Sequence, residues 1–155
     1  MEDIWLNWAP ALLENEMLVA LILFAGTAIV IALWIPGMLL PISASSGALI
    51  NVWPATAAVV FGALAGSMVI FATTRHFATG HVPLKFAAFV TRFEARFKSH
   101  GAWMVLGLRL AGAPHFLVSA SSGVMPIKAS SFALATLLGL FPAVLIGATA
   151  GAAIG

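Results

Sequence analysis

The feature that most constrains this chain is a long stretch without charged residues. Residues 17–74 contain no Asp, Glu, Lys or Arg, a run of 58 residues, and residues 129–155 are again free of charge. A helix that crosses a bilayer needs roughly 20 apolar residues. Only 8% of the chain is charged and 62% is hydrophobic, whereas a soluble domain carries about 25% charged residues. The pattern excludes a soluble enzyme, a nucleic-acid-binding module and a disordered tail, and it predicts an all-α integral membrane protein.

Breaks within the first run divide it into segments. Residues 17–35 predict a first transmembrane helix, which Pro36 and Gly37 end because proline lacks an amide donor and disfavours helical geometry before it. Residues 38–51 are apolar but too short and too interrupted to cross a bilayer. Broken backbone at membrane depth must be shielded from lipid, so we expect a re-entrant segment there. Residues 55–74 predict the next transmembrane helix.

Glycines spaced four residues apart predict close contacts between helices. Gly62 and Gly66 form one such set within the second predicted span. Gly147, Gly151 and Gly155 form another near the end of the chain. The second set predicts a contact either within the chain or between chains, so a homo-oligomer is one possibility.

The segment 83–99 is different in character from the rest. Its aromatic side chains recur at helical spacing, and most of its bases fall elsewhere on the helix. Such a helix lies in the membrane interface, attracted to anionic headgroups. The predicted membrane-interface residues are Lys85, Phe86, Phe89, Arg92, Phe93, Arg96, Phe97 and Lys98. Because bases favour the cytoplasmic side, residues 75–100 are expected to be cytoplasmic.

An internal repeat relates the two halves of the chain. The sequence Ser-Ala-Ser-Ser-Gly at residues 43–47 recurs unchanged at residues 119–123, an offset of 76. We expect a single domain over residues 1–155, with repeat one at about 17–75 and repeat two at about 101–155. If the N-terminus is cytoplasmic, the first span leaves the cell and the second returns. The first broken segment then dips in from outside and the second from inside. Two such copies form an inverted repeat whose broken segments meet near the midplane and form a substrate site.

Arg109 is the most informative single residue for function, because it is a charged residue whose neighbours on both sides are apolar or small. A charge within the membrane usually faces a cavity or a partner, and a guanidinium suits phosphate or carboxylate. The alternative is that Arg109 extends to the cytoplasmic surface and only anchors its segment. His115 is a candidate for anion binding or proton relay, or for a structural role.

The remaining candidates lie on the two broken segments. Serine hydroxyls and free backbone amides there are expected to bind headgroup oxygens, or the small residues merely allow close packing. With Arg109 and His115, the predicted substrate-binding residues are Pro36, Gly37, Ser45, Ser46, Gly112, Pro114, Ser121 and Ser122. The four histidines have no paired spacing and cysteine is absent, so we predict no metal site and no cofactor. A serine hydrolase is disfavoured because no acid follows Glu94 and no Gly-x-Ser-x-Gly motif is present.

The order of these features resembles the SNARE-associated, VTT-domain superfamily, to which the bacterial DedA proteins belong. The matching pieces are Ile35-Pro36-Gly37 leading to Ser46-Gly47-Ala48-Leu49, Gly62 to Gly66 ahead of Arg75, Phe93 to Gly101, and Leu108-Arg109-Leu110 followed by Pro114, Gly123, Phe132 and Leu138-Gly139. The resemblance implies two opposed re-entrant segments, movement of lipids between leaflets, and a role for Arg109 as the family's recurrent arginine. Residues 17–74 lack the acid that proton-coupled carriers of undecaprenyl phosphate in this family tend to have. The match is therefore nearer to the SNARE-associated Golgi type.

These observations favour a non-enzymatic flippase or scramblase for lipids with a phosphate-bearing headgroup. Its partners would be anionic or phosphate-bearing membrane lipids, with no nucleic acid, and its location the bacterial inner membrane as a multi-pass protein. Two alternatives remain open at this point: a coupled transporter of a small anion, and a non-transporting membrane assembly factor.

Overall fold

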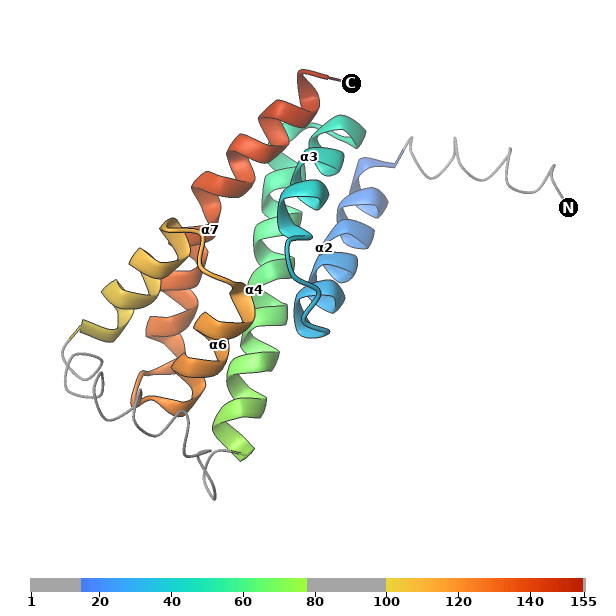
Figure 1. Cartoon of the computed structure of the whole chain (residues 1–155). Coiled ribbons are helices and arrows are strands. Elements are labelled where there is room, and N and C mark those ends of the chain that lie inside the picture. The colour runs from blue at the N-terminus through green and yellow to red at the C-terminus, as the bar shows by residue number, and fades with distance from the viewer. Residues whose placement is uncertain (1–14, 78–99, 155) are drawn as a thin grey trace, which may run out of the picture.

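The structure, a computed structural model, describes residues 15–77 and 100–154, and its regular elements are all helices (Figure 1). Residues 100–110 are also helical. No strand occurs in the two described ranges, which agrees with the predicted all-helical class. The predicted interfacial helix at residues 83–99 lies outside the described residues. The helices are α2 (Glu16–Ala32), α3 (Leu39–Leu49), α4 (Val52–Phe77), α6 (His115–Val124) and α7 (Ala129–Ala152).

Two long helices, α4 and α7, form the centre of the molecule and run in opposite directions (Figure 1). With 26 and 24 residues, they are about 39 and 36 Å long at 1.5 Å per residue. Both are long and apolar enough to cross a membrane, whose hydrocarbon core is about 30 Å thick. Phe71 of α4 stacks on Phe132 of α7 with 4.6 Å between ring centroids. Val59 and Ala63 of α4 share a buried apolar cluster with Val144 of α7.

The helices α2 and α3 form a hairpin that enters and leaves at the same end of the molecule (Figure 1). α2 runs parallel to α4. A Cβ added at Gly62 would lie 2.5 Å from the carbonyl oxygen of Phe24, and one at Gly66 would lie 2.5 Å from that of Ala28. The close contact predicted at these glycines is therefore confirmed.

This hairpin corrects the expected path of the first span. Residues 17–35 were expected to cross from the side that holds Arg75, with the chain folding back only after the crossing. Instead α2 begins at the opposite end of α4 from Arg75, and α3 returns to that same end (Figure 1). The physical reason is the parallel glycine contact with α4, followed by a reversal at residues 33–38.

Backbone geometry explains where the two reversals occur. The turn after α2 places Gly37 at φ +78°, and the turn after residues 100–110 places Gly112 at φ +75°. This left-handed region costs glycine little because it has no Cβ. Trp34 also has a positive φ, +59°, which is uncommon for a residue with a side chain. Pro36 and Pro114 lie in the same turns, so the breaks read from the sequence are the reversals of two hairpins.

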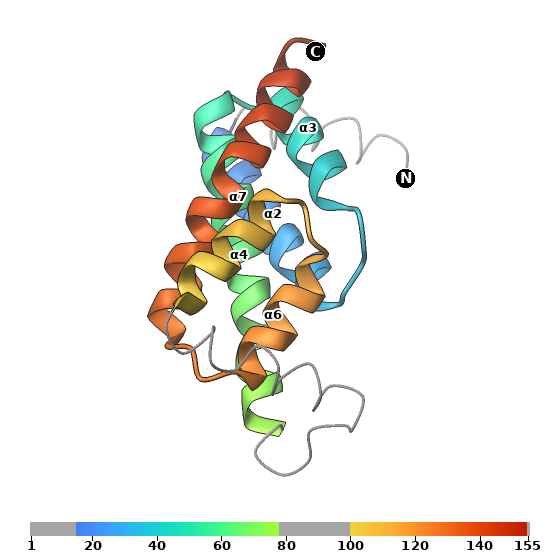
Figure 2. The ribbon, with the colours of Figure 1, turned by 60° about the vertical axis from the view of Figure 1, so that its left-hand side comes forward.

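The second hairpin consists of residues 100–110 and α6, and it enters from the other end (Figure 2). Residues 100–110 pack on α7, where a Cβ added at Gly139 would lie 2.5 Å from the Cβ of Arg109. α6 packs on α4, where a Cβ added at Gly123 would lie 2.6 Å from the carbonyl oxygen of Phe71. Each short helix thus packs on the long helix of the other half: α6 on α4, and α3 on α7.

The contact between α3 and α7 shows which helix the glycines near the end of the chain pack against. Gly151 packs on the backbone of Ala44, and Gly147 on the side chain of Ser43. Gly47 packs in turn on the backbone of Ala148. Gly147 and Gly151 therefore make a contact within the chain, while Gly155 lies outside the described residues.

Arg75, which was predicted only as part of a basic cytoplasmic region, also closes the end of α6. Its guanidinium donates hydrogen bonds to the carbonyl oxygens of Gly123 (3.4 Å), Met125 (2.8 Å) and Ile127 (2.6 Å). It also lies over the ring of Phe71, 4.5 Å from the centroid. Carbonyls at a helix C-terminus lack partners within the helix, so Arg75 fastens α6 to the last turns of α4.

Candidate functional site

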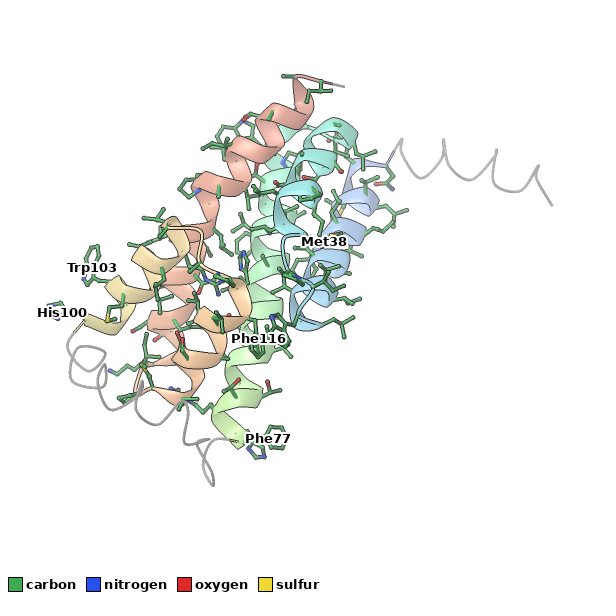
Figure 3. All side chains as sticks on the ribbon, in the orientation of Figure 1. Met38, Phe77, His100, Trp103 and Phe116 are labelled. Carbon is green, nitrogen blue, oxygen red and sulfur yellow. The ribbon has the colours of Figure 1, made fainter. Side chains whose placement is uncertain are left out.

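A cavity of about 330 Å³ lies where the turns of the two hairpins meet. In Figure 3 the labelled Met38 and Phe116 mark the two turns, which face each other in the middle third of the molecule. Both turns and the middle of α7 contribute to its wall. The lining residues are Ile31, Trp34, Ile35, Pro36, Gly37, Met38, Leu39, Leu40, Arg109, Gly112, Ala113, Pro114, His115, Phe116, Leu140 and Ala143.

Among the described residues that form this wall, Arg109 supplies the one charged side chain. It lies in the last turn of the helix 100–110, and only 4% of its surface is exposed. Its Nη1 donates to Nδ1 of His115 (2.6 Å), and its Nη2 donates to Oγ of Ser119 (2.8 Å) and of Ser67 (3.2 Å). We call Arg109, His115, Ser119 and Ser67 the Arg109 cluster. Its members come from the helix 100–110, from α6 and from α4.

The Arg109 cluster does not satisfy every donor of the guanidinium. The buried Nε has no hydrogen-bond partner among the described residues. Leaving a buried donor without a partner costs about 1–3 kcal/mol, and more for a charged group. The Nε–H and one N–H of Nη1 thus remain for a ligand in a site that already holds the other three N–H groups.

The contact with Arg109 also fixes the form of His115. A guanidinium has only donors, so Nδ1 of the imidazole accepts the hydrogen bond. The ring is then neutral and carries its proton on Nε2. Because His115 lines the cavity, the site holds a second N–H donor beside Arg109.

No carboxylate near the cavity balances the charge of Arg109 in the structure described. Residues 15–77 and 100–154 include one carboxylate side chain, Glu16, which is exposed in the first turn of α2, far from the turn of that hairpin. The partners of Arg109 are two hydroxyls and a neutral imidazole. A buried charge without a counter-ion is costly, and an anion in the cavity would offset that cost.

One of the two interpretations of the sequence had Arg109 extend to the cytoplasmic surface, and the structure does not show this. The guanidinium is held between α4 and α6 by Ser67 and Ser119, and the residue is almost fully buried. Its side chain also packs on Gly139 of α7. The interpretation that remains is an arginine inside the protein, at the wall of a cavity.

An aromatic pair joins the two turns at the cavity. Trp34 stacks on Phe116 with 4.0 Å between centroids and 25° between planes. Trp34 belongs to the first hairpin and Phe116 to the second, and 57% of the Trp34 surface is exposed. The pair therefore forms a contact between the two halves of the chain beside the cavity.

Six of the predicted site residues meet at this cavity. Arg109 and His115 lie in its wall, and so do the four turn residues Pro36, Gly37, Gly112 and Pro114. These turn residues leave backbone at the cavity in place of bulky side chains.

The four predicted serines do not line the cavity. Ser45 is exposed on α3. The hydroxyls of the other three donate to carbonyl oxygens of their own helices: Ser46 to Ser43 (2.8 Å), Ser121 to Leu117 (2.6 Å) and Ser122 to Val118 (2.6 Å). The repeated Ser-Ala-Ser-Ser-Gly segments instead pack closely on the long helices through Gly47 and Gly123.

Sequence reasoning missed two members of the Arg109 cluster. Ser119 begins the second repeated segment but was not selected among its serines. Ser67 is the single hydroxyl side chain between Thr56 and Thr73 in an otherwise apolar stretch. An isolated hydroxyl at the middle of a predicted span was the available signal.

Within residues 15–77 and 100–154, fold and site together define a class: an all-helical protein with two helices able to cross a membrane and a buried cationic cluster where two hairpins meet. The family model of the VTT domain matches residues 35–153, most of the chain. The protein belongs to the VTT-domain family, whose members are membrane-associated and are generally regarded as non-enzymatic. No curated protein and no solved structure matches the chain significantly.

Proposed function

We propose that this protein moves lipids with a phosphate-bearing headgroup between the leaflets of a membrane, and that the cavity between the hairpin turns receives the headgroup. The observation that carries the proposal is Arg109, a buried charge at the cavity wall with no carboxylate near it in the described structure. Membership in a family of membrane proteins supports it. It involves no enzymatic step and no cofactor.

The donors at the cavity favour an oxyanion. The free Nε of Arg109 and the Nε2–H of His115 are both donors, and the two serines of the cluster are already engaged by the guanidinium. A phosphate offers several acceptor oxygens and a negative charge, and such charge-assisted hydrogen bonds are about twice as strong as neutral ones. The cluster thus provides what a phosphate needs and little that an ammonium group could use.

The remaining wall favours a lipid over a free anion. Apart from Arg109 and His115, the side chains that line the cavity are apolar. Several of them are also exposed at the surface, among them Trp34, Ile35 and Leu40 at 57%, 44% and 62%. A headgroup in the cavity can therefore stay attached to hydrocarbon chains that lie along this apolar surface in the bilayer.

The membrane arrangement we propose is an inverted repeat. In it α4 and α7 cross the bilayer in opposite directions, and the two hairpins are re-entrant from opposite faces, with their turns near the midplane. Broken helices that meet there are a recurring way to build a transport site. The end that holds Arg75 and His100 is cytoplasmic by the positive-inside rule.

Cysteine labelling tests this arrangement, since the chain has no native cysteine. Single cysteines at Asn15 and Asn51 are expected to react with an impermeant maleimide from outside the cell, and a cysteine at Ser130 only from the cytoplasmic side. All three positions are exposed. Asn51 labels from outside also if α2 crosses the membrane, so it serves as the control. A cysteine at Asn15 that labels only from inside would contradict the hairpin arrangement.

Reconstitution tests the function itself. Vesicles of phosphatidylcholine that contain the purified protein and a trace of fluorescent phosphatidylglycerol are expected to expose the inner-leaflet label to dithionite. Protein-free vesicles should keep roughly half of the signal protected. Release of encapsulated phosphate without lipid movement would favour a transporter of small anions. If neither lipid movement nor release of phosphate is observed, the result would favour an assembly factor.

A further inference from the structure

Ser67 is a buried polar residue that no motif in the sequence assigns. It lies on α4, its exposed fraction is 0%, and its Oγ accepts a hydrogen bond from Nη2 of Arg109 at 3.2 Å. Arg109 itself lies 42 residues further along the chain, on the second hairpin. The contact therefore joins the long helix of the first half to the charged residue of the second.

The pattern of contacts shows what Ser67 does to the guanidinium. Nη2 carries two N–H groups, and Ser67 and Ser119 accept one each. His115 accepts from Nη1. With both protons of Nη2 engaged on two different helices, the plane of the guanidinium is fixed. The donors left without a partner are the Nε–H and one N–H of Nη1.

The hydroxyl of Ser67 behaves differently from others in these helices. The hydroxyls of Ser122, Thr27 and Thr74 donate to carbonyl oxygens one turn earlier in their own helices, which is the usual local bond of such residues. Ser67 makes no such bond in the described structure, and its one hydrogen bond there is to Arg109. A serine that only filled space in an apolar helix would not need this partner.

The internal repeat supplies a comparison within the molecule. At the offset of 76, Arg109 corresponds to Leu33, Ser67 to Ala143 and Ser119 to Ser43. Ala143 also lines the cavity, and the hydroxyl of Ser43 donates to its own helix at Leu40. The equivalent pair, Leu33 and Ala143, thus has neither the charge nor the hydroxyl.

We propose that Ser67 is a positioning residue of the anion site: it orients the guanidinium of Arg109 so that the remaining N–H groups are held ready for a phosphate group. This inference rests on the proposed function and adds α4 to the site. Because Ser67 and Arg109 belong to different halves, the affinity for phosphate depends on how closely α4 packs on the second hairpin.

The test compares Ser67→Ala with Ser122→Ala in the full chain. Ser122 is the matched control because it is as buried as Ser67 and its hydroxyl bonds within α6 without touching Arg109. Binding of inorganic phosphate to the purified proteins in nonionic micelles is measured by calorimetry. Transport of fluorescent phosphatidylglycerol is then measured against its mole fraction in vesicles.

For Ser67→Ala we expect binding of phosphate to weaken about five- to tenfold, because one of the three hydrogen bonds that orient the guanidinium is lost. The half-saturating mole fraction of the lipid should rise by a similar factor while the maximal rate stays near that of the parent protein. Ser122→Ala should leave both quantities unchanged. A lower maximal rate with unchanged half-saturation would indicate fewer folded molecules and overturn the inference, as would equal behaviour of the two variants.

The two proposals fail in distinguishable ways. If the parent protein binds phosphate and Ser67→Ala weakens that binding, but no lipid moves, lipid transport is wrong and the positioning role stands. If Arg109→Ala stops transport while Ser67→Ala matches Ser122→Ala, the function stands and the positioning role is wrong. If the parent protein binds no phosphate, the positioning role is wrong whatever the vesicles show.

Discussion

Arg109→Ala is expected to abolish lipid movement in reconstituted vesicles while the protein stays inserted and folded. The variant removes the one charge that the described residues place in the cavity wall, and with it the free N–H groups that a phosphate would use. Truncating one partner of a buried, hydrogen-bonded charge pair costs about 2–5 kcal/mol, so transport should fall roughly 30-fold or more. Loss of a buried, uncompensated charge also relieves its desolvation, so thermal stability in detergent should be kept.

Arg109→Lys separates charge from geometry. An ammonium keeps the positive charge but has three donors in place of the planar fork, and it cannot contact His115, Ser119 and Ser67 in the same way. We expect partial transport, between the parent protein and Arg109→Ala. If the lysine variant transports lipid at the parent rate and the alanine variant is only mildly impaired, Arg109 does not bind the phosphate. An alanine variant that fails to accumulate would point to a structural ion pair with a carboxylate outside the described residues.

Gly47→Ala is expected to disrupt the packing of α3 on α7. The added Cβ would meet the carbonyl group of Ala148, and a backbone carbonyl cannot rotate away as a side chain can. Overpacking of this kind costs about 1–3 kcal/mol and occasionally more. We expect a lower melting temperature in detergent and a smaller yield of monodisperse protein. Gly151→Ala, which meets the backbone of Ala44 from the other side, should behave alike.

Two other glycines provide matched controls for this prediction. A Cβ added at Gly26 of α2, or at Gly107 in the helix 100–110, would meet nothing within 4 Å. Alanine is favoured over glycine in a helix by up to about 1 kcal/mol, so these variants should be neutral or slightly more stable. If Gly47→Ala has the same melting temperature as Gly26→Ala, α3 does not pack on α7 as described.

The sequence by itself determined the positions of the breaks and the apolar surroundings of Arg109 along the chain, but it left open whether that residue is buried or extends to the surface. A proline beside or close to a glycine in an apolar run ends a helix, which is why the turns at Pro36-Gly37 and at Gly112 to Pro114 could be predicted. An arginine among apolar residues must find polar partners, because hydrocarbon offers none. Close helix contacts at Gly62 and Gly66 follow from local spacing in the same way.

The tertiary structure alone decided how the first apolar segment runs. Residues 17–35 are long enough either to cross a bilayer or to form one arm of a hairpin, and composition is the same in both cases. The parallel contact of α2 with α4 chose the hairpin. The partner of Gly147 and Gly151 was likewise open, since a small-residue face fits a helix of the same chain as well as one of another.

The hydroxyl groups show most clearly which features the sequence determined and which the tertiary structure decided. The sequence drew attention to the repeated serines, yet Ser46, Ser121 and Ser122 are satisfied by carbonyls of their own helices. Ser67, inconspicuous in the sequence, bonds to Arg109 because α4 passes beside the second hairpin at that residue. Serine and threonine hydroxyls in a helix commonly bond to a carbonyl one turn earlier, as these three do. Which hydroxyl finds another partner depends on the neighbouring helix, and only the packing of the two halves supplies that neighbour.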